Sequence, residues 1–196
     1  MGLLKHLDEL DKHYSRRIHY LDFGPLNTVI YYLARFFNPE NLVSVYLIIF
    51  FLSGKNFFYL FMFFEGAALS LLLSVFLKGK IGRLRPVFPD DVNKSGYLRG
   101  LEKLNSMPSG DAIQAGYFAT FCMYHFNCPY VLIICFLALY GRVHFVIHWI
   151  GDIIVGLIIG MVFSYILQTI FVTIVQWAAW ELNEFYLPVI WKNLFE

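Results

Sequence analysis

Charged residues are scarce in this chain. Only 15% of its 196 residues are Asp, Glu, Lys or Arg, whereas 59% are hydrophobic. A soluble domain usually contains about 25% charged and about 45–50% apolar residues, so the composition excludes an ordinary water-soluble domain. The net charge of +1 lacks the basic excess that binding to a phosphate backbone requires, and this excludes nucleic acid as a partner.

Cysteine is also rare. Cys122, Cys128 and Cys135 lie in apolar stretches and form no Cys-x-x-Cys pair, which is typical of small buried hydrophobic side chains. The sequence contains no cluster with metal-ligand spacing and no glycine-rich nucleotide-binding loop. We therefore expect no metal and no other cofactor.

Runs with little or no charge determine the predicted architecture. A spanning helix needs about 20 apolar residues. The strongest runs, divided at Pro129 where the longest is broken, are 41–53, 57–77, 112–126, 129–141 and 153–180. A further run, 25–37, is short and carries Arg35. The sequence predicts an all-α fold, a polytopic transmembrane helical bundle with five or six spans.

The whole chain, 1–196, is expected to form a single membrane-embedded domain. Residues 1–24 are predicted to include an amphipathic helix that lies on the membrane surface. Residues 41–165 carry the motifs described below. Residues 178–196 mix Trp, Tyr and charged side chains, which suits the membrane–water interface.

Polar residues that could do chemistry stand at the ends of the predicted spans. Successive spans run in opposite directions. The end of one span and the start of the next therefore lie on the same membrane face. The residues at these positions are Lys78, Arg85, Ser109, Gly110, Asp111, Arg142, His148 and Asp152.

Most of these groups suit a phosphate. Lys78, Arg85 and Arg142 are cations for phosphate oxygens, and Arg can make bidentate contacts. Ser109 and Gly110 stand just before a predicted helix, where backbone N–H groups and the helix dipole bind anions. The sequence therefore predicts a phosphate-binding site.

His148 and Asp152 complete the pattern. They are four residues apart and share one helix face. A carboxylate bonded to one imidazole nitrogen fixes the tautomer and leaves the other nitrogen as a base or nucleophile.

The three motifs resemble the signature of the type 2 phosphatidic acid phosphatase family. They are Lys78, six residues, then Arg85-Pro86; Pro108-Ser109-Gly110; and Arg142, five residues, His148, three residues, Asp152. The resemblance covers about residues 41–165 and implies a helical membrane bundle. It implies that His148 attacks phosphorus to form a phosphohistidine and that Asp152 orients it. It also implies that Lys78, Arg85, Ser109, Gly110 and Arg142 hold the phosphoryl group.

Asp111 departs from the family pattern. The second motif of the family ends in His, which protonates the leaving oxygen, and a carboxylate beside a phosphate is repulsive unless protonated. Three interpretations stay open. Asp111 is an acid kept protonated by burial and the nearby phosphate; or no acid is needed because the substrate is a diphosphate with a weakly basic leaving group; or the chain binds a lipid phosphate with weakened catalysis. His144 is an alternative source of the proton.

The expected function is metal-independent hydrolysis of a membrane lipid phosphate or a polyprenyl diphosphate, in the endoplasmic reticulum or plasma membrane. Two alternatives remain. One is a phosphotransferase or head-group transferase that uses the same intermediate, and the other is a lipid-phosphate-binding membrane protein without turnover.

The side of the membrane that the site faces depends on the span count. With five spans, thirteen cations share the face of the site and only Lys55 and Lys192 lie opposite, so the positive-inside rule predicts a cytosolic site. The family resemblance implies a lumenal or outer site. Six spans would move Lys5, Lys12, Arg16 and Arg17 away from the site and leave nine cations against six. This arrangement, with an extracytoplasmic site, is the one we favour from the sequence.

Overall fold

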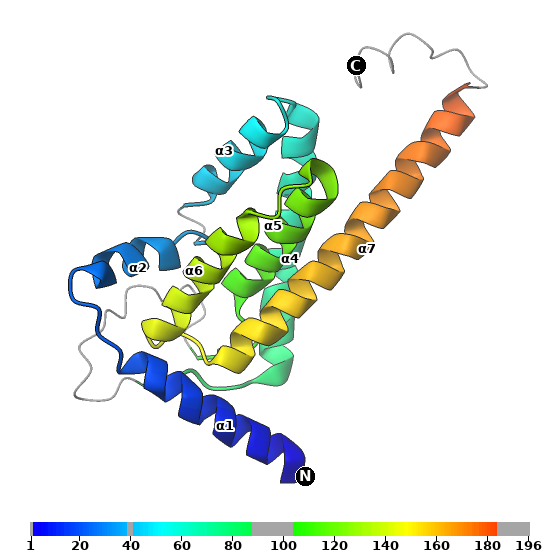
Figure 1. Cartoon of the computed structure of the whole chain (residues 1–196). Coiled ribbons are helices and arrows are strands. Elements are labelled where there is room, and N and C mark those ends of the chain that lie inside the picture. Colours follow the sequence, from blue (N-terminus) through cyan, green and yellow to red (C-terminus); the bar gives the residue numbers. More distant parts are fainter. Residues whose placement is uncertain (1, 39–40, 88–103, 184–196) are drawn as a thin grey trace.

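The computed structural model describes residues 2–38, 41–87 and 104–183. Within these ranges the regular structure is helical, apart from one isolated bridge between Leu84 and Asn105. The helices are α1 (Gly2–His19), α2 (Leu26–Ala34), α3 (Leu42–Leu52), α4 (Phe57–Ile81), α5 (Gly110–Phe126), α6 (Val131–His144) and α7 (Ile150–Asn183) (Figure 1).

The helix boundaries follow local chemistry. The side chain of Asn56 caps α4 by accepting the Phe58 N–H, and α4 ends at Gly82, which has φ 64°, as left-handed caps require. Asn127, with φ 49°, ends α5 just before Pro129. The run 112–141 is therefore two helices, as predicted. Residues 178–183 continue α7, and the remainder of the predicted interfacial tail, 184–196, lies outside the described residues.

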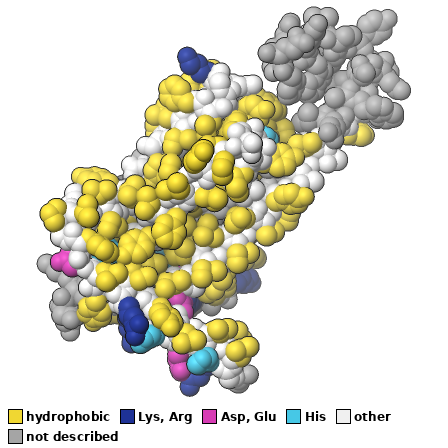
Figure 2. Space-filling model, in the orientation of Figure 1, with side chains coloured by type: hydrophobic (Ala, Val, Ile, Leu, Met, Phe, Trp, Pro, Cys, Tyr) yellow, Lys and Arg dark blue, Asp and Glu magenta, His cyan; other side chains and the backbone are white. Residues whose placement is uncertain are grey.

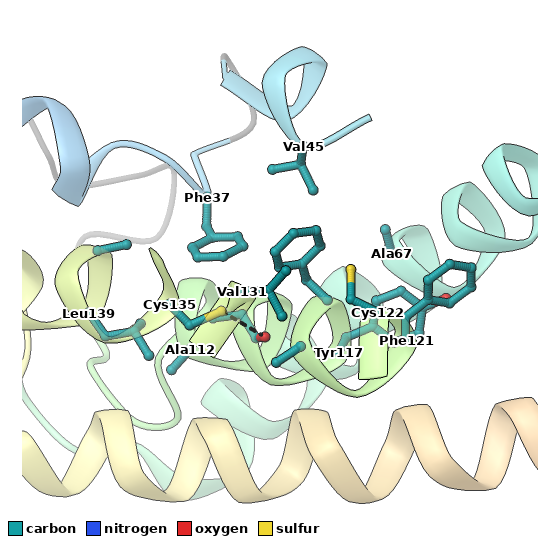
Figure 3. Close-up of a cluster of buried hydrophobic side chains, with 14 of the residues drawn as sticks. Phe37, Val45, Ala67, Ala112, Tyr117, Phe121, Cys122, Val131, Cys135 and Leu139 are labelled. Atoms are coloured by element: carbon teal, nitrogen blue, oxygen red, sulfur yellow. Dashed lines mark hydrogen bonds between the residues drawn. The ribbon is translucent and has the colours of Figure 1, made fainter. Parts of the chain in front are cut away.

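The hydrophobic core is built around α5. Most side chains of α5 are buried, including Tyr117 and Phe121. Figure 3 shows these rings together with Ala67 of α4 and Cys135 of α6. The Cys135 thiol donates to the Ala115 carbonyl at 3.5 Å. A helix buried on all sides needs no polar face, which explains why α5 lacks a clear apolar stripe.

Glycines bring α5 and α7 into close contact. A Cβ atom at Gly116 would lie 2.5 Å from the Leu157 carbonyl oxygen, and one at Gly156 would lie 2.7 Å from the Ser109 carbonyl oxygen. A Cβ atom at Gly160 would overlap the Ile113 carbonyl. Small residues are what permit such backbone approach between membrane helices.

The flank of the bundle is apolar. Two helical segments are long and apolar enough to cross a membrane, Phe57–Ile81 and Ile150–Ile174, with mean hydropathies of 2.1 and 2.3. Many large hydrophobic side chains of these segments, such as Leu72, Phe76 and Ile158, are exposed. Figure 2 shows hydrophobic side chains over the flank, with charged side chains gathered towards the ends. An apolar surface of this extent suits an integral membrane protein.

The position of α1 bears on the number of spans. The six-span arrangement would put Lys5, Lys12, Arg16 and Arg17 on the face away from the predicted site. In the structure α1 packs against the start of α7, where the Ile150 N–H donates to Ser15 Oγ at 2.9 Å.

Candidate active site

The turn between α6 and α7 holds His148. The Arg142 carbonyl accepts the Ile147 N–H at 3.1 Å and the His148 N–H at 3.4 Å, so one carbonyl closes the turn. Val146 adopts a left-handed conformation with φ 58°, which is unfavourable for a β-branched residue. His148 itself is buried, with 2% of its surface exposed.

The two ring nitrogens of His148 face different groups. Nε2 lies 3.5 Å from Arg85 Nη1, and Nδ1 lies 3.6 Å from Asp152 Oδ2. The second distance is slightly longer than a hydrogen bond, and Nδ1 has no hydrogen-bond partner among the described residues. Hydrogen bonds at catalytic sites are often long without substrate and shorten when it binds.

The environment keeps the imidazole neutral. Burial lowers the pKa of His148 to about 4, and the nearby Arg85 acts in the same direction, whereas Asp152 opposes both. A neutral imidazole has a free lone pair at pH 7, and this is the form that a nucleophile or general base requires.

Asp152 is fixed through both carboxylate oxygens. It is fully buried. Oδ2 accepts the Trp149 N–H at 2.9 Å, in the way that the third residue of a helix often reaches back to the N-cap. Oδ1 accepts from Arg83 Nη1 at 2.8 Å. The carboxylate is therefore held with Oδ2 towards His148.

The first turn of α5 lies beside this pair. The Ser109 N–H donates to the Asp152 carbonyl at 3.1 Å. Ser109 Oγ accepts the Ala112 N–H at 3.3 Å, and the Ser109 carbonyl accepts the Ile113 N–H at 3.0 Å. Among the described residues, this leaves the amides of Gly110 and Asp111 as first-turn donors for an anion.

Arg142 and Asp111 form an ion pair. Arg142 Nη2 lies 2.7 Å from Asp111 Oδ2, with the guanidinium side chain 3% and the carboxylate side chain 19% exposed. Arg142 also donates to the side chain of Asn38. Asp111 therefore contacts a cation of the candidate site.

The remaining predicted residues are distributed as follows. Lys78 is buried in the last turn of α4, at the same end of that helix as Arg85. His144 Nε2 lies 3.1 Å from Asn27 Oδ1, and its ring stacks on Tyr140, so its contacts serve packing.

Sequence reasoning missed two residues. Arg83 is absent from the predicted site residues, although its Nη1 donates to Asp152 Oδ1. Its place between Lys78 and Arg85 was the available signal. Asn38 had no signal, because its contact with Arg142 joins residues 104 positions apart. In the described parts of the chain, no three His, Cys, Asp or Glu side chains are grouped as metal ligands.

Known proteins share this architecture. The family model of the PAP2 superfamily matches residues 59–176. The fold is similar to the first transmembrane PAP2 type phosphatidylglycerolphosphate phosphatase from Bacillus subtilis, with a TM-score of 0.67, 20% identity and coverage of 86% of this chain and 88% of that one. It is also similar to Aquifex aeolicus LpxE, with a TM-score of 0.66, 22% identity and coverage of 82% and 95%. No curated protein matches the sequence.

Proposed function

The chain belongs to the PAP2 superfamily, and on this basis we propose that it removes a phosphate from a membrane lipid phosphate or diphosphate through a phosphohistidine at His148. The observation that carries the proposal is the arrangement of the imidazole. Nε2 lies 3.5 Å from Arg85 Nη1, while Nδ1 faces the fixed carboxylate of Asp152. The phosphatase named in one of the two similar structures supports the same class of reaction.

The proposed reaction has two steps. Nε2 of His148 attacks phosphorus, the N–P bond forms, and the bond from phosphorus to the leaving oxygen breaks. Asp152 stabilises the positive charge that develops on the ring. A water oxygen then attacks phosphorus, the N–P bond breaks, and inorganic phosphate leaves. The cations Lys78, Arg85 and Arg142 and the amides of Gly110 and Asp111 stabilise the charge on the phosphoryl oxygens.

The Asp111–Arg142 ion pair favours a diphosphate as the substrate. Asp111 lies 2.7 Å from Arg142, so the proposal assigns it to the ion pair and not to protonation of an alkoxide leaving group. A phosphate leaving group is much less basic and leaves without an acid. Replacing Asp111→His restores an acid, so we expect it to raise hydrolysis of monophosphates more than that of diphosphates.

The test is phosphate release from a panel of lipid monophosphates and prenyl diphosphates, with wild type and His148→Ala. We expect turnover by the wild type, unaffected by chelator, and trapping of acid-labile phosphate on the protein. Loss of all wild-type activity in chelator would reject metal independence. Equal turnover by His148→Ala would reject the nucleophile.

The same panel tests the two alternatives. A phosphotransferase would pass labelled phosphate, or a head group, to an acceptor other than water. A lipid-phosphate-binding protein would bind in a manner that depends on Arg85 and Arg142 and release no phosphate. Neither has a specific observation in its favour.

We also propose five crossings, with the N-terminus and the site on one face. The contact of Ser15 with the start of α7 supports this arrangement. Single cysteines at positions 5 and 55 are expected to be labelled from opposite sides. Labelling of both from one side would reject it.

A further inference from the structure

The start of α7 is capped by another helix. Trp149, the residue before α7, has an indole side chain that cannot accept hydrogen bonds from the first turn. The Ile150 N–H donates instead to Ser15 Oγ at 2.9 Å, and the Gly151 N–H donates to Asp11 Oδ1 at 2.9 Å. Two groups that a helix start leaves unpaired are therefore satisfied by α1.

The approach of α1 is close at this point. Ser15 is fully buried, and its hydroxyl also donates to Asp11 Oδ1 at 3.2 Å. A Cβ atom at Gly151 would lie 2.6 Å from Asp11 Oδ2 and 3.3 Å from Arg83 Nη1. The absence of a side chain at position 151 thus lets the acidic face of α1 reach the backbone of α7.

Arg83 extends this contact to the reacting pair. Its Nη2 donates to Asp8 Oδ1 and Asp11 Oδ2, each at 2.7 Å, and its Nη1 donates to Asp152 Oδ1 at 2.8 Å. The guanidinium also lies over the Trp149 ring. A hydrogen bond from Lys12, together with Arg83, lowers the pKa of Asp8 against the opposing effect of burial, so Asp8 remains ionised.

We propose that Arg83, held by Asp8 and Asp11, is the positioning residue for the His148–Asp152 pair, and that α1 is therefore a part of the active site. The proposal rests on the proposed function. Its physical reason is that Trp149 holds Oδ2 and Arg83 holds Oδ1 of the same carboxylate. Without Arg83, the buried Oδ1 loses this donor, and the Trp149 N–H alone is left to hold the carboxylate towards Nδ1 of His148.

The test compares Arg83→Gln with the double variant Asp8→Asn, Asp11→Asn. Asparagine keeps an oxygen that can accept the Gly151 N–H, so the cap of α7 is preserved while the charges that hold Arg83 are removed. Residues that hold a reacting group in place typically contribute about 10–100-fold to activity. We therefore expect each variant to lower kcat by about 10-fold or more. KM should change by less than about 2-fold, because the contact is not to substrate.

The triple variant gives the sharper result. If the two carboxylates act through Arg83, adding Asp8→Asn and Asp11→Asn to Arg83→Gln causes no further loss of kcat. Multiplicative losses would overturn the proposal. The matched control is Glu9→Gln, which removes one negative charge from an exposed position of α1 and is expected to leave kcat unchanged.

A second measurement does not depend on turnover. The ¹⁵N resonances of the His148 ring, recorded on the detergent-solubilised protein, report the environment of Nδ1. They should change in Arg83→Gln and in the double variant, and stay constant in Glu9→Gln. Unchanged ring resonances in Arg83→Gln would overturn the proposal even in a protein without activity. If His148→Ala turned over substrate at the wild-type rate, the proposed function would be overturned. The ring resonances of the variants that keep His148 would still decide the role of Arg83.

Discussion

Replacement of Asp111 by Asn should strengthen the binding of inorganic phosphate, the product of the proposed reaction. Asp111 Oδ2 lies 2.7 Å from Arg142 Nη2, so the carboxylate occupies one of the cations that phosphate would contact. In the proposed site, substrate shares Arg142 with Asp111, and the negative charge of Asp111 opposes that of the phosphate.

The magnitude follows from Coulomb's law. An anion on the other side of the guanidinium would lie roughly 5 Å from the carboxylate, and at an effective dielectric constant of about 20 the repulsion is about 3 kcal/mol per unit charge. The carboxylate side chain is 19% exposed, and solvent screening reduces this to about 1.4–2 kcal/mol. We therefore expect the inhibition constant of phosphate to fall by about 10–30-fold.

The assay is competitive inhibition by inorganic phosphate, with thermal unfolding in detergent as a second readout. Asp111→Asn leaves Arg142 charged and buried, at a cost of about 1–3 kcal/mol, so its Tm should drop without phosphate. Phosphate should then raise the Tm of the variant by more than that of the wild type. Glu9→Gln serves as the control. An inhibition constant that is unchanged or higher in Asp111→Asn would refute the reasoning.

Three further predictions follow. Burial lowers the pKa of His148 to about 4, so kcat/KM, corrected for ionisation of the substrate, should stay constant as pH falls through 6.5 and decline only near pH 4–5; an acid limb centred at 6.5 would contradict this. The lowered pKa of His148 should also reduce the free energy of unfolding as pH falls from about 6.5 towards 4, because the unfolded chain takes up the proton first. This pH-dependent loss of stability should be absent in His148→Ala when unfolding is followed against pH. Gly160→Ala should lower stability by about 1–3 kcal/mol, because its Cβ would overlap the Ile113 carbonyl. The control, Gly79→Ala, has open space around the new Cβ and should raise stability by about 0.5–1 kcal/mol. Equal Tm values for the two variants would count against the packing of α5 on α7.

The sequence was sufficient for the helices that carry few charges and for bringing Arg85 and His148 to the same end of the bundle. The runs 57–77 and 153–180 correspond to α4 and α7, because a long apolar run in this composition has few alternatives to a helix. Because successive helices are antiparallel, the end of one lies beside the start of the next. This rule is enough to predict that Arg85 lies near His148, 63 residues later in the chain.

The position of α1 could not be predicted in the same way. Its amphipathic pattern is satisfied equally by a membrane surface on either side. The contacts that decide its place join Asp11 to Gly151 and Asp8 to Arg83, and such pairs depend on three-dimensional packing that no local pattern encodes. For the same reason Arg83 could not be distinguished from an ordinary positive flank.

The close contact between α5 and α7 has an evolutionary consequence. At Gly116, Gly156 and Gly160 the two backbones meet without an intervening side chain. The spacing between the amides at the start of α5 and the imidazole before α7 is therefore determined by main-chain atoms. Mutations on α4 or α6, away from Lys78 and Arg142, can accommodate a longer tail or a bulkier head group without altering that spacing. A lineage with this packing can diversify in the lipids it accepts while its chemistry stays constant.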